Sequence, residues 1–345
     1  MKKVQWISIV ILLCGIFLVG AEPNPSHYRI AGRIHVEGEG GWDLLAVDDS
    51  TGRLFLSHSS VVDVIDTKTG KPIGVIPDTK GVHGIALATD LNKGFITCGK
   101  DTSVAIIGLD SLQIVSRVKV TGQNPDAILY EPASHRVFAF NAASASATVI
   151  DGKTGKVIAT RALDGKPELA ATDGKGTVFV NLQDKNMVEV IDADSLRAKA
   201  KWPIAPGEDP TGLAIDVASR RLFIGCNNKL MVVMDADNGK VVASLPVGEH
   251  VDGIGFDPAL KRAYSSNGDG TLTVVEEVDK DAFRVIENVP TQKGARTLAV
   301  DTKTHHIFLP TAEFGETPAP TPDNPRPRPV MVPGSFVVLD VAPLK

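Results

Sequence analysis

Ionisable side chains recur along the chain at intervals of 40 to 44 residues, each two to four residues after a glycine. The members of this series are Asp43, His83, Asp126, Glu168, Asp252 and Arg296, and Thr211 takes the remaining position. Carboxylates and imidazoles can ligate a divalent cation or perform acid–base work on a small substrate. Either chemistry requires these side chains to converge, so the fold must bring together residues that are spread over most of the sequence.

A second series with the same period predicts the fold. The chain contains 12 Phe and 3 Tyr, and seven of these residues are spaced by 40 to 44 positions. They are Phe55, Phe95, Phe138, Phe179, Phe223, Tyr264 and Phe308. A period in the low forties with strand-like composition is typical of a β-propeller in which each repeat forms one four-stranded blade. We therefore expect an all-β, seven-bladed β-propeller spanning residues 22–345 as a single domain.

The third strand of each expected blade and the turn after it carry a family resemblance. In the third repeat, the run 147–151 (ATVID) is followed by the turn 152–156 (GKTGK), and the first repeat has VDVID followed by TKTGK over 62–71. These repeats resemble those of the YVTN-repeat (YncE-like) β-propellers over nearly the whole chain from Tyr28. The resemblance implies the architecture. It leaves the function open, because such propellers serve as binding modules, scaffolds and, in related groups, enzymes.

The last repeat lacks a fourth strand, because it ends with a strand at 336–341 and the sequence stops at Lys345. The run Tyr28–Val36 looks like a fourth strand without the first three. We expect it to close the ring by pairing with the last blade, which would remove a free sheet edge.

The first 21 residues predict a secretory signal peptide. Lys2 and Lys3 precede an apolar run that ends in the small residues Gly20 and Ala21. An uncleaved membrane anchor is the alternative. Cleavage would place the chain in the periplasm or outside the cell, with no membrane span. It would also change the formal net charge from −5 to about −7, which argues against coating of nucleic acid.

The last repeat also contains an insertion, residues 313–334, which we call the proline arm. It holds seven prolines, and Arg326 and Arg328 alternate with three of them. Such a segment favours an extended, polyproline-like backbone. Its place between the second and third strands puts it on the top face, at the ends where the first strands begin. We expect either a lid or partner-docking arm, with Arg326 and Arg328 as contacts, or a tolerated surface loop.

In a seven-bladed ring, the recurring ionisable residues would surround the top mouth of the central channel. His58 and several Asn residues would lie near them, at the tops of the second strands. We predict a ligand site formed by Asp43, His58, His83, Asp126, Glu168, Asp252 and Arg296. Asp43, His83 and Asp126 come from consecutive repeats and are the best candidates for a metal site. The alternative is that these side chains only cap strand ends and meet solvent.

Two functions follow from this reading. The first is an exported, monomeric binding module that presents its top face to a small molecule or a protein. The second is a metal-dependent hydrolase of the lactonase type, with a divalent cation at the channel mouth as its possible cofactor. The sequence contains no Cys-x-x-Cys-His haem motif, no phosphate-binding loop and no Gly-x-Ser-x-Gly elbow.

Overall fold

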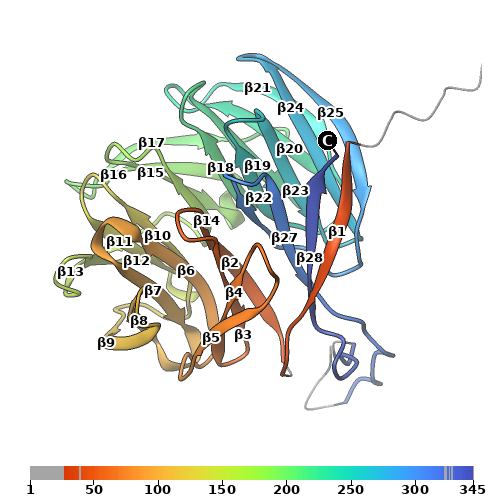
Figure 1. Ribbon diagram of the computed structural model, residues 1–345. Helices are drawn as coiled ribbons and strands as arrows, with labels where there is room; N and C mark the ends of the chain where they lie inside the picture. The colour runs from red at the N-terminus through yellow and green to blue at the C-terminus, as the bar shows by residue number, and fades with distance from the viewer. Residues whose placement is uncertain (1–26, 39, 322–324, 326, 328, 345) are drawn as a thin grey trace, which may run out of the picture.

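A computed structural model describes residues 27–38, 40–321, 325, 327 and 329–344 (Figure 1). Its strands form seven four-stranded antiparallel sheets among the described residues, and these sheets are arranged around a ring as the blades of a propeller. The structure thus confirms the predicted all-β, seven-bladed β-propeller. The expected signal peptide lies outside the described residues, which contain no helix long and apolar enough to span a bilayer.

The blades are numbered by the order of their innermost strands along the chain. These innermost strands are β2 (Trp42–Asp48), β6 (Val82–Ala88), β10 (Pro125–Glu131), β14 (Pro167–Thr172), β18 (Pro210–Asp216), β22 (Val251–Asp257) and β26 (Ala299–Asp301). The second strands are β3 (Arg53–His58), β7 (Lys93–Cys98), β11 (Arg136–Asn141), β15 (Thr177–Leu182), β19 (Arg221–Cys226), β23 (Arg262–Asn267) and β27 (His306–Thr311).

The third strands are β4 (Val61–Asp66), β8 (Ser103–Gly108), β12 (Ser146–Asp151), β16 (Met187–Asp192), β20 (Leu230–Asp235), β24 (Thr271–Asp279) and β28 (Val337–Pro343). The outer strands are β5 (Pro72–Ile76), β9 (Gln113–Lys119), β13 (Val157–Ala162), β17 (Ala198–Pro203), β21 (Val241–Pro246), β25 (Ala282–Pro290) and β1 (Tyr28–His35). Short 3₁₀ turns are η1 (Thr89–Leu91), η2 (Gly99–Asp101), η3 (Ala142–Ser144) and η4 (Gln183–Lys185).

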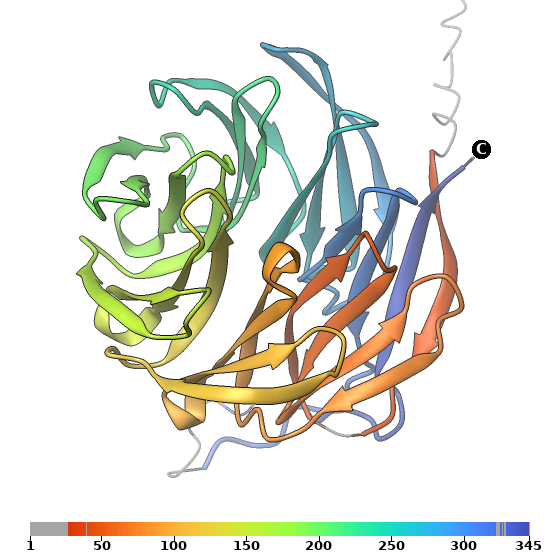
Figure 2. The same ribbon diagram turned by 60° about the vertical axis from the view of Figure 1, so that its left-hand side comes forward.

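The N-terminal strand closes the ring, as the sequence predicts. Strand β1 pairs with β28 in the sheet order β1-β28-β27-β26, and the two strands lie side by side in both views (Figures 1 and 2). The hydroxyl groups of Tyr28 and Tyr264 lie 2.9 Å apart, and Arg262 donates a hydrogen bond of 2.8 Å to the Tyr28 hydroxyl. The closing strand is therefore tied to blade six as well as to its own blade.

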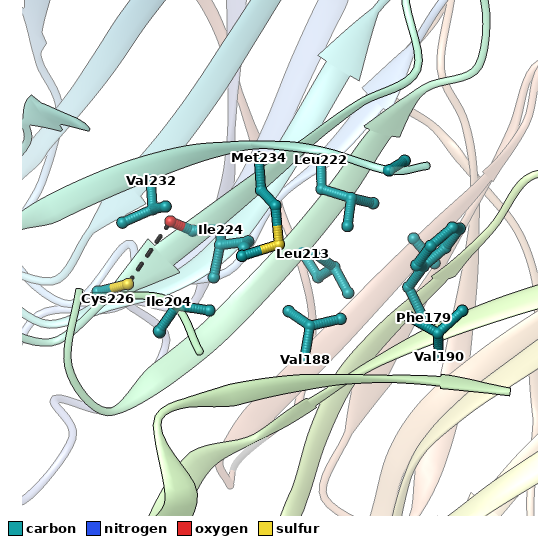
Figure 3. Close-up of a cluster of buried hydrophobic side chains, with 12 residues drawn as sticks. Phe179, Val188, Val190, Ile204, Leu213, Leu222, Ile224, Cys226, Val232 and Met234 are labelled. Carbon is teal, nitrogen blue, oxygen red and sulfur yellow. Dashed lines mark hydrogen bonds between the residues drawn. The ribbon is translucent and has the colours of Figure 1, made fainter. Parts of the chain in front are cut away.

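The core is divided among the seven contacts between neighbouring blades in the described ring. Each recurring aromatic side chain is fully buried and belongs to a different one of these clusters. Between blades four and five, Phe179 and Leu213 meet across one such contact (Figure 3). The period of the aromatics thus reflects one large buried side chain per blade interface, where burial contributes about 1.5–3 kcal/mol for each side chain.

The two cysteines in the described residues, Cys98 and Cys226, are buried and free. They belong to different clusters, between blades one and two and between blades four and five. Burial raises the pKa of the Cys226 thiol to about 12, so it remains an uncharged core side chain.

Candidate functional site

Threonine hydroxyl groups hold the beginnings of neighbouring inner strands together at the top face. Thr97 Oγ1 accepts a hydrogen bond from the Gly84 amide at 2.8 Å and donates one to the Asp126 carbonyl at 2.5 Å. At the ring closure, Thr297 Oγ1 donates to the Asp43 carbonyl at 2.7 Å. These contacts fix the backbone from which the ionisable residues project, and they join consecutive blades.

Three of the predicted residues form one cluster. His83 Nδ1 lies 2.7 Å from Asp43 Oδ2 and 3.7 Å from Asp126 Oδ1. One ligand atom from each residue can be chosen so that all three atoms lie within 4.8 Å of one another. The other side of the imidazole packs on the backbone, since a Cβ at Gly99 would lie 2.9 Å from His83 Nε2. Gly99 is therefore needed to let His83 face the two carboxylates.

The pKa values of this cluster shift in the directions that its geometry requires. The hydrogen bond to Asp43 raises the pKa of His83, although burial acts against this. Burial raises the pKa of Asp126 to about 6, and the negative charges of Asp43 and Glu168 add to that effect. The mouth of the channel thus holds a carboxyl group with a pKa of about 6 beside an imidazole whose pKa is raised above its ordinary value.

The opposite side of the mouth carries a second set of predicted residues. Arg296 donates a hydrogen bond of 2.8 Å to Asp252 Oδ2. Burial nevertheless raises the pKa of Asp252 to about 7, and the charges of Asp43, Glu168 and Asp126 add to this shift. The carboxylates of blades one, three and four therefore repel the negative charge of Asp252 in blade six.

A pocket of about 240 Å³ opens at this side of the mouth. Glu168, Asp252 and Arg296 line it together with Thr211. Thr211 interrupts the ionisable series, and its hydroxyl donates to the Val251 carbonyl at 2.7 Å. The interruption leaves room between the charged groups of blades four and six.

His58 lies apart from this cluster. Its Nδ1 is 2.9 Å from Asp63 Oδ2, and its ring centroid is 4.6 Å from that of Phe336. The residue is only 2 % exposed. Its position at the top of β3 therefore places it within the contact between blades one and seven.

Arg326 and Arg328 fall outside the described residues, but the base of the proline arm is described. Phe314 and Met331 form a bridge, flanked by hydrogen bonds from the Gly315 amide to the Val330 carbonyl and from the Val332 amide to the Glu313 carbonyl, each 2.8 Å. The arm thus leaves the top of β27 and returns to β28 as a short hairpin-like ladder.

The arm borders a larger pocket, of about 1350 Å³, against blades one and seven. Trp42, Lys293 and Phe314 are among the residues that line it, and Arg296 lines this pocket and the smaller one. We call the larger one the arm pocket.

Sequence reasoning did not identify several of the residues at the mouth and the arm. Lys166 Nζ lies 2.5 Å from both Glu168 Oε1 and Gln183 Oε1. Trp42 and Lys293 line the arm pocket. A usable signal was present for Lys166 and Trp42, because Lys166 directly follows Gly165 and Trp42 directly precedes Asp43. For Lys293 no such signal exists, because its place beside the base of the arm appears only in three dimensions.

No family model matches the chain. Among curated proteins, it is 21 % identical over 281 residues to the "Uncharacterized protein YncE" of Salmonella typhimurium, and the match covers 77 % of this chain and 67 % of that protein. Together, this similarity and the seven-bladed fold support its place among the YncE-like propellers.

Solved structures show the same fold at low sequence identity. The hydrazine synthase of Kuenenia stuttgartiensis aligns with a TM-score of 0.69 at 17 % identity, covering 80 % of this chain and 94 % of that one. The WD40 repeats of RRP9 align with a TM-score of 0.74 at 9 % identity, covering 92 % and 98 %. A chain of the mitotic checkpoint complex aligns with a TM-score of 0.73 at 14 % identity, covering 88 % and 95 %. At these identities the likeness concerns the fold alone.

Proposed function

We propose that this YncE-like propeller is an exported, monomeric binding module whose channel mouth holds the cationic group of a ligand. The observation that carries the proposal is the convergence of four carboxyl groups from blades one, three, four and six at one mouth: Asp43, Asp126, Glu168 and Asp252. Two described cations, Lys166 and Arg296, are each paired with one of these carboxylates. A ligand cation would relieve the repulsion among them.

A matched pair of probes tests this binding function. Putrescine and succinate share a four-carbon chain but carry opposite charges. We expect calorimetry to detect putrescine binding to the wild type and no binding of succinate. Asp126→Asn and Glu168→Gln should weaken putrescine binding, whereas Asp237→Asn, in an exposed turn of blade five, should not. Equal binding of the two probes, or equal effects of the three variants, would refute the proposal.

A metal-dependent hydrolase of the lactonase type is the second candidate, and the Asp43–His83–Asp126 cluster favours it. Separations of up to 4.8 Å among the ligand atoms fit a cation that binds each at about 2.4 Å. These three residues would hold the ion, which would supply polarisation of a substrate carbonyl when bound. Asp252 adds a carboxyl group with a pKa of about 7, suited to proton transfer at neutral pH.

Metal analysis of the purified protein tests this candidate. The hydrolase function predicts a stoichiometric divalent metal and a melting temperature that falls when a chelator is added. The double variant Asp43→Ala, Asp126→Ala should lose both the metal and the response to chelator. It should also lose hydrolysis of a simple lactone such as dihydrocoumarin. A metal-free wild type that does not respond to chelator would leave this function without a mechanism.

A further inference from the structure

The arm pocket is a second concave site, and its walls come from distant parts of the chain. Its volume of about 1350 Å³ exceeds the range of about 300–1000 Å³ that is usual for small-molecule pockets. One wall is the base of the proline arm, a second is the segment that leads into β2, and a third is the segment that leads into β26. No single stretch of sequence could form it.

Aromatic and aliphatic side chains make up the apolar part of this pocket. The Trp42 ring stacks on buried Phe336 with centroids 5.1 Å apart. Trp42 also contacts Phe314, with ring centroids 6.0 Å apart. Phe314 is 44 % exposed and Val330 is 58 % exposed. Trp42 is thus held rigidly from behind, while the arm contributes large apolar side chains that still face water. A bound apolar group would cover them.

The polar part of the pocket is dominated by cations and donors. Lys293 is exposed, and its ammonium has no partner among the residues that the structure describes. Arg296 lies in the same wall, with its charge directed to Asp252. Glu313 is the one described acidic residue in the lining. Lys293 is therefore the group with free capacity to bind a ligand, and its charge selects an anion.

Two glycines lie in the lining of the pocket and leave space in it. Gly41 and Gly294 border the pocket, and a Cβ added at Gly41 would meet nothing within 4 Å. Gly294 adopts a φ of +90°, and a Cβ there would lie 3.2 Å from the Phe314 ring. A side chain at Gly294 would therefore crowd the Phe314 ring.

We infer that the arm pocket binds a small aryl or alkyl carboxylate, with its carboxylate on Lys293 and its apolar body against the exposed surfaces of Phe314 and Val330. This site goes beyond the proposed function, because it selects an anion and uses residues outside the acidic mouth. The base of the proline arm serves as one wall of the site. Arg296 connects the two pockets, so one ligand that carries both charges could occupy them together.

Three probes with one apolar body test the inference: 4-phenylbutyrate, 4-phenylbutanol and 4-phenylbutylamine. Calorimetric titration of the protein purified after expression of the full chain should show the tightest binding for the carboxylate. Lys293→Glu and Phe314→Ala should each weaken that binding roughly tenfold, as expected for loss of a charged hydrogen bond or of an aromatic contact. Glu313→Gln should leave the binding unchanged or tighten it.

Matched controls separate this site from the channel mouth. Lys240→Glu makes the same charge change in the exposed turn between β20 and β21 of blade five. This turn lies at the end of the blade away from the top face, so the substitution should not alter phenylbutyrate binding. Asp126→Asn should weaken putrescine but not phenylbutyrate. Phe314→Leu replaces Phe314→Ala if circular dichroism shows that the latter disturbs the fold. The inference is overturned if phenylbutyrate fails to bind, if the amine binds as tightly, or if Lys293→Glu and Lys240→Glu have equal effects.

Discussion

His83 and Asp43 stand 40 residues apart in the sequence, one repeat period, and their side chains are joined by a hydrogen bond of 2.7 Å at the channel mouth. The same imidazole nitrogen lies 3.7 Å from Asp126, which belongs to the next blade. Residues that are one repeat apart in the sequence therefore contact one another at the mouth, because their blades are neighbours in the ring. The chemistry of the mouth therefore depends on how neighbouring blades are rotated relative to one another.

The titration of His83 provides the first prediction. Because its hydrogen bond to Asp43 raises the pKa above the ordinary value of 6.5, protonated His83 stabilises the folded state. This contribution is fully present below pH 6.5 and is lost as the pH rises through the folded value. Asp43→Asn should lower the pKa of His83, which NMR titration of the imidazole protons would measure. A pKa unchanged by this substitution would contradict the assigned contact.

The ionised Asp126 carboxylate should lower the free energy of unfolding at neutral pH. Its folded pKa of about 6 exceeds the ordinary 3.8, so the folded state binds the proton more tightly than the unfolded state. The free energy of unfolding therefore falls as the pH rises from 3.8 to about 6, and the cost is complete above that range. One pKa unit corresponds to about 1.4 kcal/mol, so Asp126→Asn should stabilise the protein by about 1–3 kcal/mol at pH 7.5.

Urea unfolding at pH 7.5 and pH 5 would measure this effect. The gain from Asp126→Asn should be smaller at pH 5, where Asp126 is already largely protonated in the folded state. A variant that is less stable than the wild type at pH 7.5 would show that the attraction between Asp126 and His83 outweighs the burial of the carboxyl group.

The closing strand should be indispensable for cooperative folding. Tyr28 is 2 % exposed and bonds to Tyr264 and Arg262 in blade six. Tyr28→Ala should lower the free energy of unfolding by about 3–5 kcal/mol, as for other buried aromatics. Tyr28→Phe should cost only about 1 kcal/mol, because it removes the hydroxyl group alone.

Deletion of residues 22–38 tests the closure more severely. The outer edge of β28 would be left without its partner, so we expect loss of a single cooperative transition and increased aggregation. An unchanged melting curve would contradict the role of β1 in ring closure.

Shortening the proline arm should leave the fold intact and alter binding. The ladder between 313–315 and 330–332 belongs to the base of the arm, so the replacement by a short Gly-Ser turn should cover residues 317–328. Loop length changes closure entropy by only about 0.6 kcal/mol per doubling, so the melting temperature should change little. Binding of phenylbutyrate should fall, because Thr317 is lost from the lining.

Two outcomes of this replacement would be informative in the other direction. A collapse of the fold would make the arm a structural element. Binding that is as tight as before would show that the outer part of the arm, including Arg326 and Arg328, makes no contact with the ligand.

The sequence by itself determined the architecture. The period of residues such as Phe55 and Phe308 predicts seven blades, because each blade interface buries one large aromatic side chain. The unmatched strand that begins at Tyr28 predicts the closure. Both are consequences of local pattern and of the need to bury apolar surface and pair strand edges, so they can be read along one dimension.

The interval also singled out Asp43, His83 and Asp126, but only the tertiary structure decided which of the predicted polar residues lie together. His58 and His83 have the same side chain and both stand near the top of a strand. However, His58 is on a second strand and packs against Phe336, whereas His83 begins an inner strand and faces Asp43. Lys293 and Phe314 line one pocket only because the base of the arm lies against the segment that leads into β26. Direction, burial and proximity across blades depend on the twist and closure of the ring, and no interval in the sequence specifies them.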